Sequence, residues 1–123
     1  MNTDHSVVSP VSGFEENLKK AMTEMLILHL LSEKECYIGE LTDALHTRSN
    51  GILTIVFPYS AIYRLQQSGC IIEREKRLSP DGRRRQYFGI TETGQVYLRQ
   101  LRDAYAKFST GVANILSSGG PKT

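Results

Sequence analysis

The sequence PYSAIYRLQQSG (58–69) runs directly into CIIEREKRLSPDGRRRQYFGI (70–90), and these two segments decide the fold. Proline suits the first position of a helix, because its missing N–H has no partner there, so we expect Pro58 to begin a helix. Gly69 is expected to end it. The inward stripe consists of apolar residues at helical spacing, namely Ala61, Ile62 and Leu65. The first segment therefore predicts a short amphipathic helix.

The second segment predicts a β-hairpin over residues 70–90. Ser79-Pro-Asp-Gly82 is a strong turn signal, because proline sets φ, aspartate bonds its own backbone and glycine allows positive φ. Six cations stand against three carboxylates in the hairpin, which leaves an excess of three positive charges. The cations are Arg74, Lys76, Arg77, Arg83, Arg84 and Arg85. Three consecutive arginines therefore stand at the tip, where side chains reach furthest.

The outward face of the predicted helix is polar and carries no acidic side chain. At 100° per residue, this face consists of Ser60, Tyr63, Arg64 and Gln67. A helix lying in a DNA groove presents such a face, but exposed helix faces in general are also polar. Arg64 is suited to pair with guanine through two guanidinium nitrogens, and equally to clamp a phosphate. The Arg83–Arg85 run likewise fits either a phosphate contact or a solvated hairpin tip.

Upstream, the sequence predicts two further helices. Ser12-Gly-Phe-Glu15 matches the S-x-x-E capping box, so a first helix is expected to follow it and to end at Glu33–Glu35. A second, shorter helix is expected over Tyr37–His46. Asn50-Gly51 signals a turn. The β-branched and aromatic run Ile52–Phe57 then predicts a short strand or an extended link.

Downstream, the sequence predicts one long helix from Thr91 to about Leu116. Thr91 is a good N-cap, and Glu92 suits the helix dipole. The apolar residues follow a heptad pattern: Leu98, Leu101, Tyr105, Phe108, Val112 and Ile115. The part near Leu98 is expected to pack on its own domain. Beyond about Tyr105 the helix outruns a small core, so a second copy of the chain is its expected partner.

The first helix is expected to contribute Phe14 and Leu18 to the same interface between two copies. An alternative interpretation is an effector pocket between these helices, lined by Phe14, Tyr97, Tyr105 or Phe108. Apolar stripes at helical spacing are usually packing surfaces, which favours an ordinary dimer core over the pocket.

The order of elements is helix, helix, link, helix, hairpin and long helix. This order predicts a mainly α fold with a small β-hairpin (α+β), namely a winged helix-turn-helix domain. We expect that DNA-binding domain to span residues 12–90 and a C-terminal dimerisation helix to span residues 91–118. Residues 1–11 and 119–123 are expected to be flexible tails.

The composition argues against several other classes of protein. The chain of 123 residues suits one modest core, and its net charge is only +2. Cys36 and Cys70 form no CxxC or Cys/His cluster, so we expect no metal site, no cofactor and inert thiols, with redox sensing as the minor alternative. We find no nucleophile–base pair and no glycine-rich phosphate loop, so we expect no enzyme. The sequence has no signal-peptide run, and its longest apolar stretch, Met25–Leu31, is too short to span a bilayer, so we expect a cytoplasmic protein without a membrane partner.

The chain resembles the PadR-like family of bacterial transcriptional regulators. The resemblance is carried by the order and spacing of four stretches: Glu24–Ser32, Pro58–Leu65 leading to Gly69, Arg83–Phe88 and Ile90–Gly94. It implies a dimeric repressor of the short form, in which the third helix is the recognition helix, the hairpin is the wing and the last helix dimerises.

The resemblance also assigns individual residues. It places Tyr59 at the start of the recognition helix, and Arg84, Arg85 and Tyr87 on the basic-aromatic wing strand. The chain departs from the family in two places. Many members carry Gly-Thr-Leu-Tyr where this chain has Val56-Phe-Pro-Tyr59. Some members bind flat molecules between tryptophans at the dimer interface, and this chain has no tryptophan, so that way of binding a ligand does not carry over.

Together these expectations describe a homodimeric, sequence-specific repressor of double-stranded DNA with a pseudo-palindromic operator. A small apolar or aromatic effector at the dimer interface would relieve binding. The expected DNA contacts are Tyr59, Ser60, Tyr63, Arg64 and Gln67 on the recognition helix, and Lys76, Arg83, Arg84 and Arg85 on the wing. Two alternatives stay open: a winged-helix module that binds proteins, and a weakly specific architectural DNA binder.

Overall fold

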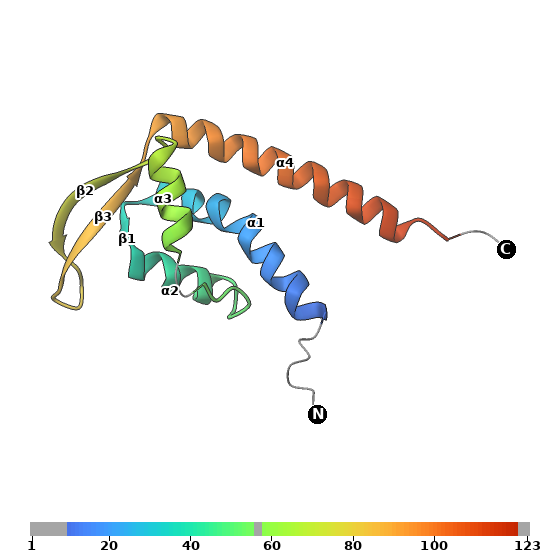
Figure 1. Cartoon of the computed structure of the whole chain (residues 1–123), viewed down its shortest axis with the longest axis horizontal. Helices are drawn as coiled ribbons and strands as arrows, with labels where there is room; N and C mark the ends of the chain where they lie inside the picture. The colour runs from blue at the N-terminus through green and yellow to red at the C-terminus, as the bar shows by residue number, and fades with distance from the viewer. Residues whose placement is uncertain (1–9, 56–57, 121–123) are drawn as a thin grey trace, which may run out of the picture.

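The computed structural model describes residues 10–55 and 58–120, and its elements follow the predicted order (Figure 1). The elements are α1 (Pro10–Glu33), β1 (Cys36–Tyr37), α2 (Ile38–Arg48), α3 (Tyr59–Gln67), β2 (Ile71–Leu78), β3 (Arg84–Ile90) and α4 (Glu92–Ser117). Three helices form a cluster, from which the β2–β3 hairpin and α4 leave in opposite directions. The mainly α fold with a hairpin and a long last helix is confirmed.

The sheet has three antiparallel strands in the order β1-β3-β2. In β1, Cys36 lies opposite Phe88 and Tyr37 lies opposite Tyr87. A two-residue strand carries no alternating pattern, so β1 could not be predicted from periodicity. The β2–β3 ladder has a register shift between Glu73 and Lys76, which marks an irregularity in the longer strand.

One hydrophobic core holds the three helices and the base of the hairpin together. Its least exposed side chains come from four elements: Ile27, Leu28, Leu41, Leu65 and Ile71. The predicted inward stripe of α3 is buried as expected, since Ala61, Ile62 and Leu65 are each 4% exposed or less. The core therefore fixes α3 by one face and leaves its other face to solvent.

The structure corrects the predicted starts of α1 and α2, and that of α3 as described below. α1 is helical from Pro10, the first described residue, so Ser12 is not its cap. Ser12 therefore lies inside the helix. α2 begins at Ile38, because Tyr37 belongs to β1 and its backbone N–H donates to the Glu40 carboxylate at 3.4 Å.

The segment between α2 and α3 is an extended link rather than a strand over residues 52–55. Val56 and Phe57, the end of the predicted run, lie outside the described residues. The predicted turn before the link is confirmed, since Asn50 and Gly51 both have positive φ. Pro58 precedes the first residue of α3 instead of occupying its first position, and its carbonyl accepts from the Ile62 N–H at 3.0 Å.

α4 is anchored at its first turn. The Thr91 hydroxyl accepts from the Gly94 N–H at 3.0 Å and donates to the Gly69 carbonyl at 2.6 Å, so the predicted N-cap is confirmed. Gly94 is buried against the Cys70 carbonyl, which a Cβ atom at this position would overlap. The start of the long helix is thereby held against the junction of α3 and β2.

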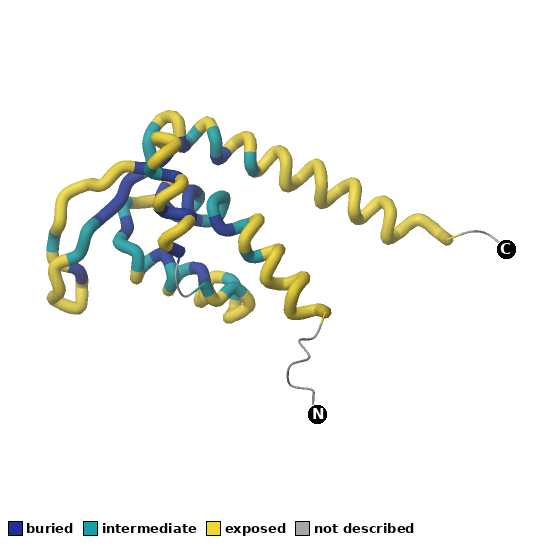
Figure 2. Tube along the Cα trace, in the orientation of Figure 1, coloured by how far each residue is buried: buried dark blue, intermediate teal, exposed yellow. Residues whose placement is uncertain are grey.

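The outer part of α4 is left uncovered by residues 10–55 and 58–120. Every residue from Arg102 to Ser117 is exposed, as are the first turns of α1 (Figure 2). Over the described residues, no helix combines the length and apolar character that crossing a membrane requires.

Candidate nucleic-acid interface

The outward face of α3 is exposed along its whole length. Ser60, Tyr63 and Gln67 are all exposed, and Tyr63 keeps 62% of its surface. Tyr59, at the start of the helix, is 57% exposed. These four side chains stand opposite the buried stripe, so the structure presents them where the sequence predicted a reading surface.

Arg64 lies at the edge of that face and turns toward α1. Its Nε donates to Oε2 of Glu24 at 2.7 Å. The other carboxylate oxygen, Oε1, accepts from the Tyr97 hydroxyl at 3.2 Å. Burial and the neighbouring Glu24 raise the pKa of Tyr97, which keeps its phenol protonated as a donor. One carboxylate on α1 thus joins α3 to α4.

A cavity of about 580 Å³ lies beside this network, between α1, α3 and α4. Its lining includes Glu24, Arg64, Cys70, Val96, Tyr97 and Gln100. Of the four aromatic residues predicted to line an effector pocket, Tyr97 lines this cavity. The other three are exposed instead: Phe14, Tyr105 and Phe108.

Two of the hairpin arginines pair with one carboxylate between α1 and β1. Glu35 accepts from Arg74 Nε at 2.9 Å and from Arg77 Nη2 at 2.9 Å. The Arg77 guanidinium also lies 3.9 Å from the centre of the Tyr87 ring, which is a cation–π distance. These pairs partly neutralise two of the hairpin cations and link β2 to the segment between α1 and β1.

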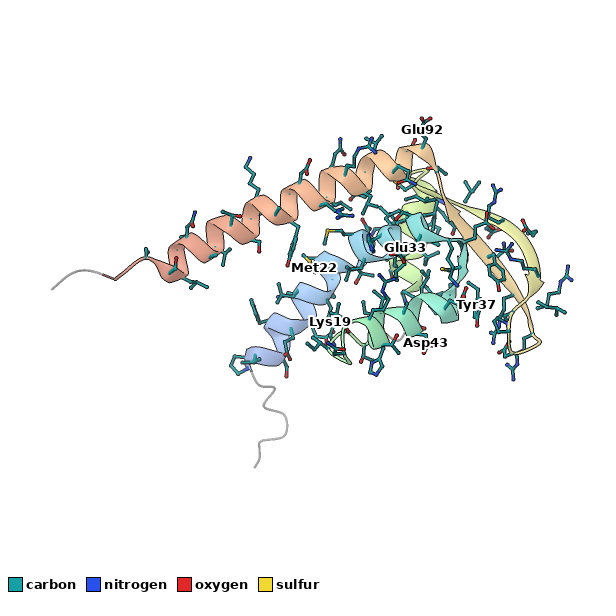
Figure 3. All side chains as sticks on the ribbon, turned by 180° about the vertical axis from the view of Figure 1, so that it is seen from behind. Lys19, Met22, Glu33, Tyr37, Asp43 and Glu92 are labelled. Atoms are coloured by element: carbon teal, nitrogen blue, oxygen red, sulfur yellow. The ribbon has the colours of Figure 1, made fainter. Side chains whose placement is uncertain are left out.

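Arg85 also makes an ion pair and a ring contact within the chain. It donates to Asp81 at 2.7 Å and its guanidinium lies 5.1 Å from the centre of the Tyr37 ring. Tyr37 sits where α2 begins, beside the wing (Figure 3), and its ring packs edge-on to Tyr87. Hydrogen bonds from Ser79, from Arg85 and from the backbone of residue 83 hold the pKa of Asp81 below its usual value. Arg85 therefore serves to shape the turn.

The remaining predicted wing cations are exposed. Among residues 10–55 and 58–120, no ion-pair partner is found for Lys76, Arg83 or Arg84. Side chains alternate along a strand, and Arg84 therefore projects from the opposite face of β3 to Arg85 and Tyr87. The hairpin thus has one face of fixed arginines and a second face, with its tip, that presents uncompensated charge.

The predicted dimer residues divide into two groups. Leu98 is 5% exposed and packs in the core of its own chain, and Leu101 packs against that core. The others remain uncovered: Phe14, Leu18, Tyr105, Phe108, Val112 and Ile115, all at least 45% exposed. We call this second set the apolar stripe. Its two parts lie on α1 and α4, which extend to the same side of the molecule (Figure 1).

Sequence reasoning missed three residues that organise this surface: Glu24, Glu35 and Tyr37. Each partners a residue about 40 or more positions away in the chain, such as Arg64 or Arg74. No local spacing reports such a pairing. The one available signal was the presence of acidic residues in α1 and just after it, close in sequence to the apolar run that forms the core.

Both cysteines are buried and free, and burial raises the pKa of the Cys36 thiol to about 11. Because the thiolate is the reactive form, we predict that neither thiol reacts with Ellman's reagent in the native protein. Both should react once urea unfolds the chain, which the absorbance of the released chromophore would measure. Rapid reaction of the native protein would instead support redox sensing. In the described part of the chain, no group of metal-ligating side chains is found.

Solved structures share this arrangement. A PadR-like transcriptional regulator from Bacillus cereus is 26% identical, with a TM-score of 0.71 over 84% of this chain and 99% of that chain. A PadR family regulator from Eggerthella lenta, 23% identical, has a TM-score of 0.74 over 89% of this chain and 94% of its own, which shows the fold alone. A transcriptional regulator from Clostridium thermocellum, 24% identical, has a TM-score of 0.69 over 83% of this chain and 99% of its own.

A comparison with curated protein sequences finds no match. The model of the transcriptional regulator PadR-like family matches residues 27–100, which include the core, α3 and the whole hairpin. That match spans more than half of the 123 residues. The chain therefore belongs to the PadR-like family of transcriptional regulators, which are DNA-binding regulators and not enzymes.

Proposed function

We propose that two copies of this chain bind a pseudo-palindromic operator and repress transcription. Each α3 enters a major groove with its exposed polar face, and each wing lies along the flanking phosphates. The observation that carries the proposal is the pairing of an acid-free exposed helix face with the uncompensated cations Lys76, Arg83 and Arg84. Such cations release counterions from DNA and supply affinity that does not depend on sequence.

The apolar stripe supports the homodimer. Phe108 and Ile115 are 72% and 76% exposed, and they continue the heptad pattern that begins in the core at Leu98. A stripe of this length on a long helix needs a facing surface, and a two-fold copy offers the same stripe in return. Two recognition helices of such a dimer would meet successive major grooves about 34 Å apart.

The cavity between α1, α3 and α4 supports regulation by a small molecule. It borders both Arg64 on the recognition helix and Tyr97 on α4, so a ligand there would contact the two parts whose relative position matters for DNA. A small apolar or aromatic effector that moves α4 would take the two recognition helices out of register and lower operator affinity.

The test is fluorescence anisotropy with the DNA upstream of the protein's own gene, beside a random duplex, over a series of salt concentrations. Tight binding of two chains to the upstream DNA, well above the random duplex, would support the repressor. Equal, weak binding to both would favour the architectural DNA binder. No binding to either at low salt would favour the protein-binding module.

Arg84→Ala should weaken binding to the operator and to random DNA by similar factors. The side chain is exposed and is expected to contact a phosphate, so its loss should lower the slope of log affinity against log salt by about 1. Arg99→Ala, which removes an exposed cation from α4, is the matched control and should change neither quantity. An unchanged salt slope for Arg84→Ala would remove this residue from the interface.

Tyr63→Ala should cost about 1–3 kcal/mol on the operator and little on random DNA. Its ring stands on the outward face of α3 and contributes nothing to the buried core, so the fold should be retained. The ratio of the two affinities, measured at one salt concentration, isolates the sequence-specific part. Equal losses on both duplexes would show that Tyr63 contacts the backbone and reads no base.

A further inference from the structure

The carboxylate of Glu24 uses both of its oxygens to join three helices. Oε2 accepts from Arg64 of α3 at 2.7 Å, and Oε1 accepts from the Tyr97 hydroxyl of α4 at 3.2 Å. The Glu24 side chain is 20% exposed and the Arg64 side chain 57% exposed, so the pair lies at the boundary of the core. We call these three residues the tie.

The tie restricts a motion that the core alone leaves open. α3 is nine residues long, and its buried contacts come from the single stripe Ala61, Ile62 and Leu65. Apolar contacts are non-directional. They therefore resist the separation of two helices better than they resist a change in the angle between the two helix axes. A charge-assisted hydrogen bond is directional. The Arg64–Glu24 bond therefore defines how α3 is turned relative to α1.

The bond from Nε to Glu24 holds the Arg64 side chain toward α1, and turning this side chain away from α1 to read a base would break that bond. Glu24 would then keep only the Tyr97 hydroxyl, and a partly buried carboxylate would stand unpaired close to DNA phosphates. Leaving one member of such a pair without its partner is costly. The balance of charges therefore favours a tie that stays closed when DNA is bound.

We propose that Glu24, Arg64 and Tyr97 are positioning residues that set the angle between the recognition helix and the two helices of the apolar stripe. This inference rests on the proposed DNA-binding function. Because α1 and α4 carry the apolar stripe, the angle fixed by the tie determines the distance between the two recognition helices of a dimer. The tie therefore determines which spacing between operator half-sites the protein accepts, and Arg64 reads no base.

The experiment starts from duplexes that the wild-type protein selects from a random library. Affinity is then measured on the selected site and on versions whose half-sites are one base pair closer together or further apart. Glu24→Gln, Tyr97→Phe and Arg64→Ala are each expected to reduce the preference for the selected spacing by about 5-fold or more. Base preference within each half-site should stay unchanged. Circular dichroism and a thermal melt check that each variant is folded.

The controls distinguish the effect of losing the tie from the effect of a changed charge and from the loss of a base contact. Asp103→Asn removes an exposed negative charge from α4 and should keep the spacing preference, whereas Gln67→Ala should relax base preference and keep spacing. Tyr97→Phe changes no charge, so its effect cannot come from weaker repulsion of DNA.

Opposite outcomes overturn the proposal. If Arg64 reads a base, Arg64→Ala will relax base preference at one position, and Glu24→Gln will leave binding equal or tighter by releasing the guanidinium. If folded Glu24→Gln and Tyr97→Phe variants keep the wild-type spacing preference, the tie has no role, although the protein is a specific DNA binder. If the wild-type protein selects no sequence at all, the proposed function itself fails.

Discussion

Phe108→Glu is expected to convert the protein to a monomer with little remaining preference for its operator. Phe108 is 72% exposed at the middle of the apolar stripe, with Tyr105 and Val112 beside it. In the proposed dimer this position is covered by the partner, so the variant would bury a carboxylate without a cation. The effective penalty for such a charge is several kcal/mol, which is enough to separate two subunits.

The DNA-binding consequence is larger than the loss of any single contact. A dimer holds two half-sites at once, and linking two binding events raises overall affinity by about 10²–10⁴-fold. Phe108→Glu should therefore lower operator affinity by about 100-fold or more, while the fold of the winged domain is retained. Sedimentation velocity gives the oligomeric state, and anisotropy on the operator gives the affinity.

Thr110→Glu is the matched control for this experiment. It adds the same charge two positions away, and at 100° per residue Thr110 lies on the opposite face of α4 from the stripe. It should leave both the dimer and the operator affinity unchanged. A dimer that survives Phe108→Glu would mean that the two copies meet through some other surface.

Gly94→Ala is expected to destabilise the fold strongly. A Cβ atom at this position would overlap the Cys70 carbonyl oxygen and would stand 2.7 Å from Cγ1 of Ile90. The first obstacle is backbone, so no rotamer change relieves it. Overpacking of this kind costs about 1–3 kcal/mol, or more where the backbone must shift.

The shift that relieves Gly94→Ala would also move α4 away from the junction of α3 and β2. We therefore expect a lower midpoint of urea unfolding and, in the fraction that stays folded, weaker operator binding. Both are measured at one fixed protein concentration, because the stability of a dimer depends on it. Gly13→Ala is the control, since a Cβ there meets no atom within 4 Å. An unchanged midpoint for Gly94→Ala would show that the contact is looser than described.

The sequence predicted the order of the elements because hydrophobic periodicity and the residues of caps and turns report it locally. The turn at Asn50-Gly51, the cap at Thr91 and the stripe of α3 are local signals, and the structure contains all three. The predicted cap of α1 at Ser12 was wrong, because the chain is already helical at Pro10, two residues earlier. β1 was missed because a strand of two residues has no period.

The candidate site was less predictable. A sequence shows which residues are charged, but it does not show which of them form ion pairs with each other. The hairpin arginines look equivalent in the chain, yet Arg77 and Arg85 are held on acidic side chains while Arg84 is left exposed. Arg64, predicted as the best base-reading residue, contacts Glu24 through its Nε. These distinctions depend on contacts between distant segments, which no local pattern reports.

The uncovered end of α4 has a consequence for the amount of regulator in a cell. An isolated helical segment of about 12–15 residues is marginal in water. The part of α4 beyond Leu101 is exposed, with no other described residue covering it. On the dimer proposal, its order is supplied by the second copy. Single chains would therefore fray and be degraded first, and only chains that have found a partner would persist. Turnover would then remove unpaired copies and enrich the remaining pool of this regulator in assembled dimers.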